Sequence, residues 1–424
     1  MNAQTNNSGE LDPSFGNNGM FELTLPPLYQ ETIISGTLID SATRNIYFAG
    51  QGRNGISDRP YVLGCLLPNG NLDNTFATQG IAMGKFSHTA ESKGNAIALL
   101  AEDKILLIGA TIGSLALARF HRNGSIDTSY GENGHLILTD PSASAPLAVE
   151  DSASEAESAQ SHTVALQDGR ILISFTYHQS GNPTHSFLFM LDIYGELDRS
   201  FNQTGSVLVK HPDHPPENIR LHGCLIDDDG SVVACASLKS ADSQASMFVR
   251  YTTVGNVESS YGENGYLVVD TQAEYALVDA LAKQGNRRIL AIGYSRSGFD
   301  YSGLLISHEW NGSANIQFNR GQPLLTRLND SDTVWVSALK LPNGSLVVTG
   351  NSKASGKPAI ALARLQSNGA FDTTFNKGQG WVVTSIGLNN TSAKNVVLQD
   401  DGKILVCGYY RETNLRAIIL RYLG

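Results

Sequence analysis

The sequence contains ten histidines, four cysteines and 40 acidic residues, but none of them stands in a spacing that common catalytic sites use. It has no His-Glu-x-x-His, no Gly-x-Ser-x-Gly, no Gly-x-x-x-x-Gly-Lys-Ser/Thr and no Cys/His metal spacing. His211 and His214 flank a Pro-Asp pair in what we expect to be a surface loop. The sequence therefore predicts no catalytic residue, no metal ion and no cofactor.

The cysteines are the next reactive side chains to place. They form no Cys-x-x-Cys and stand inside apolar runs, at positions 65, 224, 235 and 407. Cysteine in such surroundings behaves as a small hydrophobic residue. We expect four reduced core cysteines and no disulfide.

One cationic position recurs along the chain. The second β-rich run of each repeated unit ends in Gly or Ala. The third residue after that Gly or Ala is cationic in six of the seven units, and the second unit has Ile112 there instead. The six residues are Arg53, His178, Lys239, Arg296, Lys353 and Arg411. If the units close into a ring, this collar would bind a carboxylated or phosphorylated partner. Alternatively, each cation pairs with an acid of its own loop, such as Asp58, Asp242, Asp300 or Glu412, an arrangement that is common and nearly neutral in energy.

Aromatic residues crowd the same loops in the later units. The candidate binding residues among them are Tyr294, Tyr301, Tyr409 and Tyr410, with Phe299 nearby. Tyrosine and arginine together are typical of binding hot spots and of sugar platforms. We therefore expect a protein or a glycan as partner.

A sevenfold repeat positions these residues. An apolar residue, which we call the anchor, stands at 11, 72, 126, 197, 257, 314 and 371, at intervals of 61, 54, 71, 60, 57 and 57 residues. An aromatic residue follows each anchor by four places. Asp-Gly or Asn-Gly turns between apolar runs, as in Leu166–Ile173 and Leu398–Val406, predict hairpins. Four short strands per unit, repeated seven times, predict an all-β seven-bladed β-propeller of four-stranded antiparallel blades.

The repeated Leu-Asp-x-Ser-Phe motif has an architectural interpretation. An Asp accepts a hydrogen bond from the backbone two residues on and fixes a turn, and the aromatic ring is expected to wedge between blades. A calcium site is disfavoured, because each copy supplies one acid and two copies have Glu258 and Asn315 there. The structural residues are Asp12, Phe15, Asp73, Phe76, Asp127, Tyr130, Asp198, Phe201, Tyr261, Phe318, Asp372 and Phe375.

The chain begins at an anchor and stops before one. We expect residues 19–25 to be the outer strand of the last blade and to close the ring. The predicted single domain, 1–424, has blades at roughly 29–86, 87–139, 160–210, 216–270, 273–326, 331–385 and 391–424 completed by 19–25. The longest interval contains an acidic Ser/Ala-rich insertion, 139–160, interpreted as a flexible loop that is either a tolerated insertion or a partner-contacting flap.

These motifs resemble those of the delta-60 repeat family of bacterial proteins. The resemblance rests on the Leu-Asp-x-Ser-Phe-Gly-x-x-Gly units and the Asp-Gly-Lys-Ile-Leu hairpins, and it spans nearly the whole chain. It implies a propeller-like fold and no assigned activity.

Charge and hydropathy argue against some classes of partner and location. The formal net charge of −10 argues against nucleic acid as a partner. No apolar run is long enough for a membrane span, and the N-terminus has no secretory signal, so the default expectation is a cytoplasmic monomer, or export by a signal-independent route. We expect a non-enzymatic binding scaffold; the alternative is a polysaccharide- or ester-cleaving hydrolase or lyase whose active-site residues come from several blades.

Overall fold

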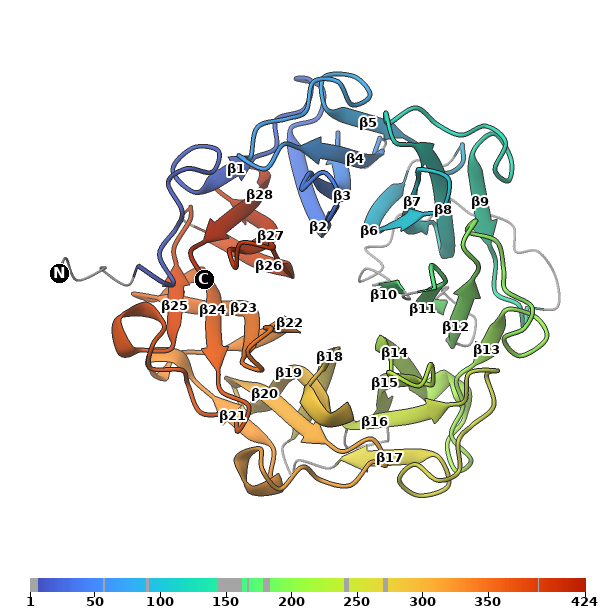
Figure 1. Cartoon of the computed structure of the whole chain (residues 1–424), viewed down its shortest axis with the longest axis vertical. Helices are drawn as coiled ribbons and strands as arrows, with labels where there is room; N and C mark the ends of the chain where they lie inside the picture. The colour runs from blue at the N-terminus through green and yellow to red at the C-terminus, as the bar shows by residue number, and fades with distance from the viewer. Residues whose placement is uncertain are drawn as a thin grey trace.

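The chain forms a ring of seven four-stranded β-sheets around a central opening (Figure 1). The structure is a computed structural model, and it describes residues 7–55, 58–88, 91–143, 162–165, 168–177, 184–239, 244–269, 274–387 and 389–424. Neighbouring strands within each sheet are antiparallel, so the predicted all-β seven-bladed propeller is confirmed. Most of the insertion predicted at 139–160 lies outside the described residues.

The blades are numbered along the chain, and the strands of each blade are named in order from the innermost outward. Blade 1 contains β2 (Glu31–Ile39), β3 (Ile46–Arg53), β4 (Tyr61–Leu66) and β5 (Ile81–Gly84); blade 2 contains β6 (Ser92–Leu100), β7 (Lys104–Thr111), β8 (Ser114–His121) and β9 (His135–Leu138). Blade 3 contains β10 (His162–Ala165), β11 (Ile171–Tyr177), β12 (His185–Leu191) and β13 (Ser206–Leu208); blade 4 contains β14 (Ile219–Ile226), β15 (Val232–Lys239), β16 (Gln244–Tyr251) and β17 (Tyr266–Val269).

The remaining blades follow the same order. Blade 5 contains β18 (Tyr275–Lys283), β19 (Ile289–Ser297), β20 (Asp300–His308) and β21 (Leu324–Thr326); blade 6 contains β22 (Val334–Lys340), β23 (Leu346–Ala354), β24 (Lys357–Leu365) and β25 (Trp381–Thr384). Blade 7 contains β26 (Asn389–Leu398), β27 (Ile404–Arg411), β28 (Leu415–Tyr422) and β1 (Met20–Glu22). Short 3-10 turns occur at Pro216–Asn218, Gly285–Arg287, Asn319–Gly321, Leu328–Asp330 and Asn376–Gly378. Within the described part of the chain, no helix has the length and hydrophobicity needed to cross a bilayer.

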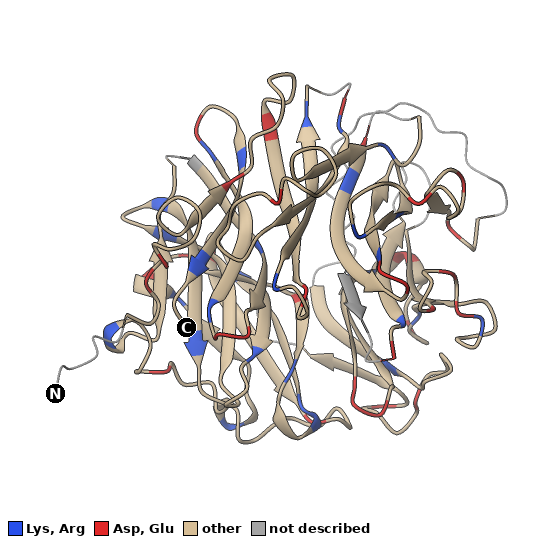
Figure 2. Ribbon diagram, turned by 45° about the horizontal axis from the view of Figure 1, so that its top comes forward, with Lys and Arg blue, Asp and Glu red and all other residues tan. Residues whose placement is uncertain are grey.

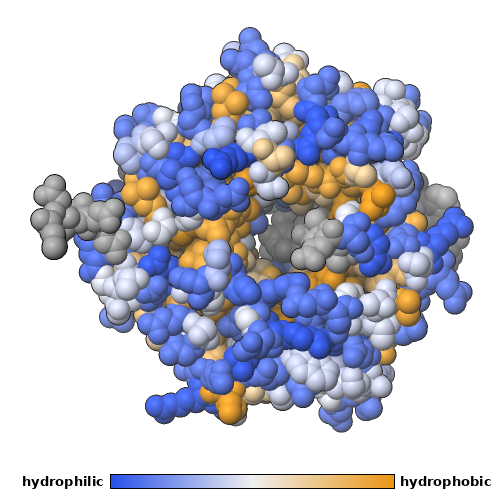
Figure 3. All heavy atoms as spheres, in the orientation of Figure 1, coloured by the Kyte–Doolittle hydropathy of each residue, from blue (hydrophilic) through white to orange (hydrophobic). Residues whose placement is uncertain are grey.

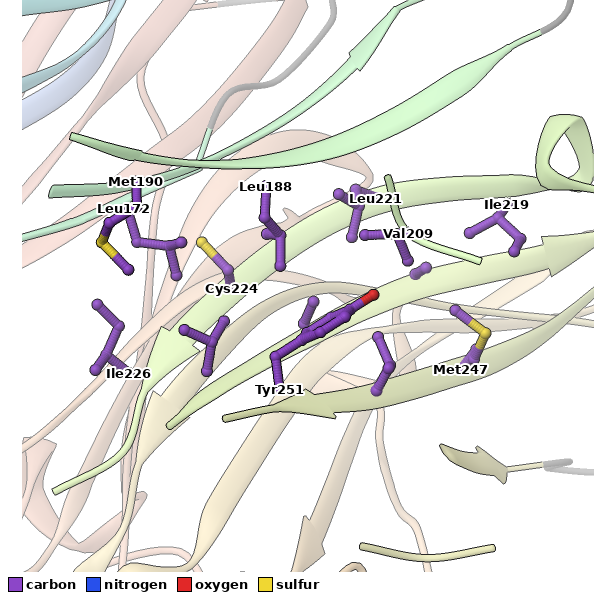
Figure 4. Close-up of a cluster of buried hydrophobic side chains, with 14 of the residues drawn as sticks. Leu172, Leu188, Met190, Val209, Ile219, Leu221, Cys224, Ile226, Met247 and Tyr251 are labelled. Atoms are coloured by element: carbon purple, nitrogen blue, oxygen red, sulfur yellow. The ribbon is translucent and has the colours of Figure 1, made fainter. Parts of the chain in front are cut away.

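The hydrophobic core lies between the blades. Middle strands such as β4 and β11 are buried along their whole length, because a neighbouring blade covers each face of a sheet. Figure 4 shows one such layer, in which Leu172 and Leu188 of blade 3 lie close to Leu221 and Tyr251 of blade 4. Burial on both faces explains why these strands are continuous apolar runs rather than alternating ones.

The repeated aromatic rings lie in these same layers. Phe15, for example, contacts a cluster that includes Phe48 of blade 1 and Leu405 of blade 7. All seven rings are at most 2% exposed: Phe15, Phe76, Tyr130, Phe201, Tyr261, Phe318 and Phe375. Each ring therefore contributes to the layer between two blades.

The Asp that follows five of the seven repeated apolar positions orders the turn after it. Oδ1 of Asp12 accepts hydrogen bonds from the backbone N–H of Ser14 at 3.0 Å and from its hydroxyl at 2.7 Å. The same pair of bonds recurs at Asp73, Asp127, Asp198 and Asp372. These bonds account for the acid without any metal ion.

An arginine eight residues before this acid completes the unit in several blades. Arg364 donates from Nε to Asp372 at 2.8 Å, and its guanidinium lies 4.9 Å from the centre of the Phe375 ring. Arg119 has the same two contacts with Asp127 and Tyr130. The arginine thus joins the third strand to the turn and covers the buried ring.

Closure of the ring uses the N-terminal segment. Met20, Phe21 and Glu22 of β1 pair with Leu420, Ile419 and Ile418 of β28, so residues from both ends of the described chain form blade 7. Glu22 also accepts hydrogen bonds from Tyr410 at 2.7 Å and from Arg416 at 2.9 Å. Closure by an N-terminal strand therefore agrees with the expectation.

Candidate functional site in the central channel

Three cations of the predicted collar lie in ion pairs. The carboxylate of Glu274 is 3.4 Å from Arg296, that of Asp332 is 2.6 Å from Lys353, and that of Glu31 is 3.6 Å from Arg411. These partners come from the loops or strands that enter the blades rather than from the cation's own loop, where the sequence had suggested them. Figure 2 shows basic and acidic segments interleaved along the loops. A carboxylate therefore balances three of the six residues expected to form the collar.

The other collar residues differ. Nε of Arg53 donates to Oε1 of Gln51 at 2.8 Å, and burial lowers the pKa of this guanidinium. Lys239 is exposed at the end of β15. His178 lies outside the described residues.

The tyrosines of the later blades form two groups. In blade 5, Tyr294 stacks on Tyr275 with ring centres 5.8 Å apart, and Tyr301 lies 5.7 Å from Tyr294. In blade 7, Tyr410 is 7% exposed and bonds to Glu22, so its hydroxyl belongs to the closure of the ring. Tyr409 is half-buried, and the Nζ atom of Lys394 lies 5.6 Å from the centre of its ring.

A repeated irregularity in the innermost strands creates a different site. In six of the blades, one or two residues of the innermost strand fall out of register with the second strand, as β-bulges. The seven bulged residues are Ser35, Asn95, His222, Asp279, Val336, Asn390 and Lys394. A bulge turns a side chain away from the alternation of its strand. Because the strands surround the central opening, the bulges form a ring of mostly polar residues around it.

Glycines of the second strands make these bulges possible. A Cβ atom on Gly350 would lie 1.9 Å from the carbonyl oxygen of Val334, and one on Gly408 would lie 2.0 Å from that of Ser392. The same close approach occurs at Gly50, Gly109 and Gly293. No side chain fits there, so a repeated glycine in the second strand goes with a bulge in the first.

Two lysines stand in the innermost strands of the blades beside blade 1. Lys93 of β6 and Lys394 of β26 belong to blades 2 and 7, on either side of blade 1. Burial, reinforced by the positive charges of Lys394 and Arg53, lowers the pKa of Lys93 to about 7. The innermost strand of blade 1, β2, lies between the two strands and contacts both of them. Figure 3 shows the central opening as a hollow in the surface.

Neither ammonium group is in a direct ion pair in the described structure, although the negative charge of Glu91 acts on Lys93 from farther away. Ion pairs within 4.0 Å involve neither Lys93 nor Lys394 among the described residues, and both side chains are half-buried. Like charges that are partly removed from water and have no direct ion pair destabilise the folded protein. The channel lysines, Lys93 and Lys394, therefore resemble a site built for an anion.

Asp279 of blade 5 and His222 of blade 4 form a second pair of titratable groups in the innermost strands. Oδ1 of Asp279 is 3.9 Å from Nδ1 of His222, whose Nε2 atom lies 2.8 Å from the hydroxyl of Ser237. Burial raises the pKa of Asp279 to about 7, although the positive charges of Lys394 and Arg220 oppose the rise. The side chain of Asp279 keeps 20% of its exposure, so solvent still reaches the carboxyl group.

Metal chemistry finds no support in the described residues. They contain no cluster of three or more His, Cys, Asp or Glu side chains that could hold an ion. The four cysteines are buried and form no disulfide, and burial raises the pKa of the Cys224 and Cys407 thiols to about 12.

The channel residues were not among those predicted from the sequence. Lys93, Asp279 and Lys394 stand in strands whose other residues have the pattern of a core, and the expected site lay in the loops. A sequence signal for the bulges was present: a polar residue followed by a small one in the first strand, as in Asn95-Ala96, His222-Gly223 and Asp279-Ala280. In blades 2 and 5 a glycine of the second strand accompanies this pair.

Comparisons with known proteins support the fold. The profile of a family described as "Domain of unknown function (DUF5122) beta-propeller" matches residues 102–130 and 341–375. No curated protein matches the chain. The crystal structure of the polysaccharide lyase Uly1 is similar with a TM-score of 0.51 at 11% identity, over 100% of this chain and 93% of that one.

Two further structures have lower scores. Drosophila Plexin A in complex with Semaphorin 1b gives a TM-score of 0.47 at 10% identity, over 97% of this chain and 88% of that one. The Dos1 propeller gives 0.46 at 10% identity, over 95% and 93%. The chain is accordingly a β-propeller repeat protein with seven blades, and two of its segments match a β-propeller family of unknown function.

Proposed function

We propose that this protein is a non-enzymatic binding scaffold that holds an anionic group in its central channel, between Lys93 and Lys394. The observation that carries the proposal is the pair of half-buried ammonium groups, from blades 2 and 7, with no carboxylate within 4.0 Å among the described residues. A bound carboxylate, sulfate or phosphate would supply the missing counter-ion through charge-assisted hydrogen bonds. This anionic group would be part of a small molecule, of a glycan or of a protein.

The proposal also fits the charge of the whole molecule. A net charge of −10 gives no long-range attraction for anions, so recognition has to be local. The paired cations of the loops contribute little, because exposed ion pairs are nearly neutral in energy. The delta-60 resemblance and a monomeric state are consistent with such a scaffold and are part of the same proposal.

One observation favours a second candidate, the hydrolase or lyase. Asp279 has a pKa of about 7 beside His222, which is the range useful to a general acid or base. A panel of polysaccharide and ester substrates, compared between the protein and its Asp279→Asn variant, tests this candidate. Turnover that disappears with the substitution would favour the enzyme.

A titration with inorganic phosphate and with citrate at low salt tests the scaffold. Charge-assisted hydrogen bonds contribute about 1.5–3 kcal/mol each, so Lys93→Met and Lys394→Met should each weaken binding by about 10- to 100-fold. Lys357→Met, at an exposed lysine that begins β24, is the matched control and should leave affinity unchanged. Equal affinity in the wild type and in both channel variants would exclude the proposed site.

A further inference from the structure

We propose that the groove between blades 1 and 2 binds a small phenol-type molecule, whose aromatic ring lies beside Ala82 and whose hydroxyl group bonds to Tyr61. Ala82 stands in β5, the outermost strand of blade 1, which Figure 1 shows on the outer side of the ring of blades. The site uses neither channel lysine, so it is separate from the proposed anion site.

A cavity of about 590 Å³ opens between the two blades. Pockets that bind small molecules have volumes of about 300–1,000 Å³. Side chains of both blades line this cavity, among them Tyr61, Ala82 and Met83 of blade 1 and Phe120, Ile126 and His135 of blade 2. The groove therefore has the size and the mixed apolar and polar walls of a ligand site.

The sevenfold repeat explains why the cavity lies at this position. Ala82 pairs with Leu63 of β4 and packs on the apolar layer between blades 1 and 2. The same ladder position carries a larger apolar residue in the other blades: Phe21, Leu136, Val207, Leu267, Leu324 and Val382. In those blades the protein fills the space with its own side chain. Alanine leaves it open.

Blade 7 shows which group fits this position. Phe21, the counterpart of Ala82, places its ring 5.6 Å from the ring of Phe48 in blade 1, measured between ring centres. The groove between blades 7 and 1 is smaller, about 450 Å³, and Phe21 lines it. An aromatic ring from a ligand would therefore occupy beside Ala82 the place that a phenylalanine side chain occupies in blade 7.

Tyr61 offers this ligand both an aromatic surface and a hydrogen bond. Its ring centre lies 6.1 Å from that of Phe120, in an edge-to-face arrangement, and such aromatic pairs are favourable beyond the area that they bury. The Tyr61 hydroxyl lies 3.1 Å from Nε2 of His135. A hydroxyl has one donor and two acceptor positions, so this contact leaves capacity for a ligand. A Cβ atom on Gly84 would lie 2.4 Å from that hydroxyl oxygen, so glycine provides the room for it.

These two features together select the class of ligand. Benzene would fill the space beside Ala82 and leave the Tyr61 hydroxyl without a new bond. Cyclohexanol would supply the hydroxyl group and lose the aromatic contacts. A phenol supplies both.

Methyl NMR of the full chain, labelled with ¹³C-methyl methionine, tests the site with phenol as the probe. Met83 lines the cavity, Met20 lines the smaller groove, and Met190 is buried between blades 3 and 4. The ring current of bound phenol should shift the Met83 signal and leave the Met20 and Met190 signals unchanged. Benzene and cyclohexanol should each bind about 10-fold or more weakly than phenol.

Three variants locate the binding. Ala82→Leu introduces the residue that blades 2 and 4 have at this position, and it should weaken phenol binding by about 10-fold or more. Val382→Leu enlarges the counterpart residue in blade 6 and should leave the affinity for phenol within about twofold. Tyr61→Phe should remove the advantage of phenol over benzene.

The outcomes that overturn the inference are distinct. A Met83 signal that millimolar phenol does not shift would exclude the site, as would equal affinities of the wild type and Ala82→Leu. Benzene or cyclohexanol binding as tightly as phenol would exclude the proposed class of ligand. The comparison of Met83 with Met20 in the wild type needs no variant, so the test holds even if Ala82→Leu folds poorly.

Discussion

Replacing Lys93 with methionine should stabilise the protein, although it removes a residue of the proposed site. Burial and the neighbouring charges of Lys394 and Arg53 lower the pKa of this lysine from 10.5 to about 7. That change corresponds to at most about 5 kcal/mol, and contact with channel water reduces it to about 1–2 kcal/mol. We expect Lys93→Met to raise the free energy of unfolding by that amount at pH 6, without ligand.

The sign of the pH dependence follows from linkage. Between pH 7 and 10.5, the unfolded chain keeps the Lys93 proton and the folded protein loses it, so the stability of the wild type rises with pH in this window. The advantage of Lys93→Met should therefore be complete below pH 7. It should fall by more than half by pH 9.5.

Urea unfolding in buffers without multivalent anions measures both effects. The exposed Lys357→Met control should show no such pH-dependent difference. Adding inorganic phosphate at pH 6 should stabilise the wild type and leave Lys93→Met unchanged, because only the wild type has both channel lysines. A difference between wild type and Lys93→Met that is flat from pH 6 to 9.5 would refute the reasoning, and so would a destabilised variant at pH 6.

Three further predictions follow from the structure. Asp279→Asn should stabilise the protein above pH 7 and have no effect near pH 4, because the raised pKa of Asp279 makes the stability of the wild type fall as pH rises from 3.8 to about 7. Urea unfolding at pH 4 and pH 8 measures this difference in stability, and an equal effect at both pH values would contradict the prediction. Removal of residues 1–25 should expose the edge of β28 and cause aggregation or a large fall in melting temperature, whereas an unchanged melting curve and a soluble monomer on size exclusion would contradict the closure. Phe201→Ala and Phe375→Ala should each destabilise by about 3–5 kcal/mol and leave phosphate affinity of the folded fraction intact; loss of binding at full stability would assign the rings a functional role.

The fold was predictable because its signals repeat. A spacing that recurs seven times, with an aromatic residue four places after each anchor, is visible without knowledge of any contact. The turn at Asp12 is local, since its partner is two residues away. Closure followed from counting strands, because the chain begins and stops within one unit.

The channel was not predictable in the same way. Lys93 and Lys394 are about three hundred residues apart, and they approach one another only when the ring closes. Asp279 leaves the alternation of its strand because of a bulge, and Gly293, the glycine that permits the bulge, stands in another strand. A search for motifs in the loops could not find a site formed by single residues of separate strands. The carboxylates that pair with Arg296 and Arg411 were missed for the same reason.

A crystal structure from crystals grown or soaked in selenate, with anomalous diffraction recorded at the selenium edge, tests the central claim most directly. We expect an anomalous peak in the central channel within hydrogen-bond distance of both Nζ atoms, and its disappearance in the Lys93→Met, Lys394→Met double variant. A channel without a peak would contradict the anion site, as would lysines that have each moved onto a carboxylate of the protein.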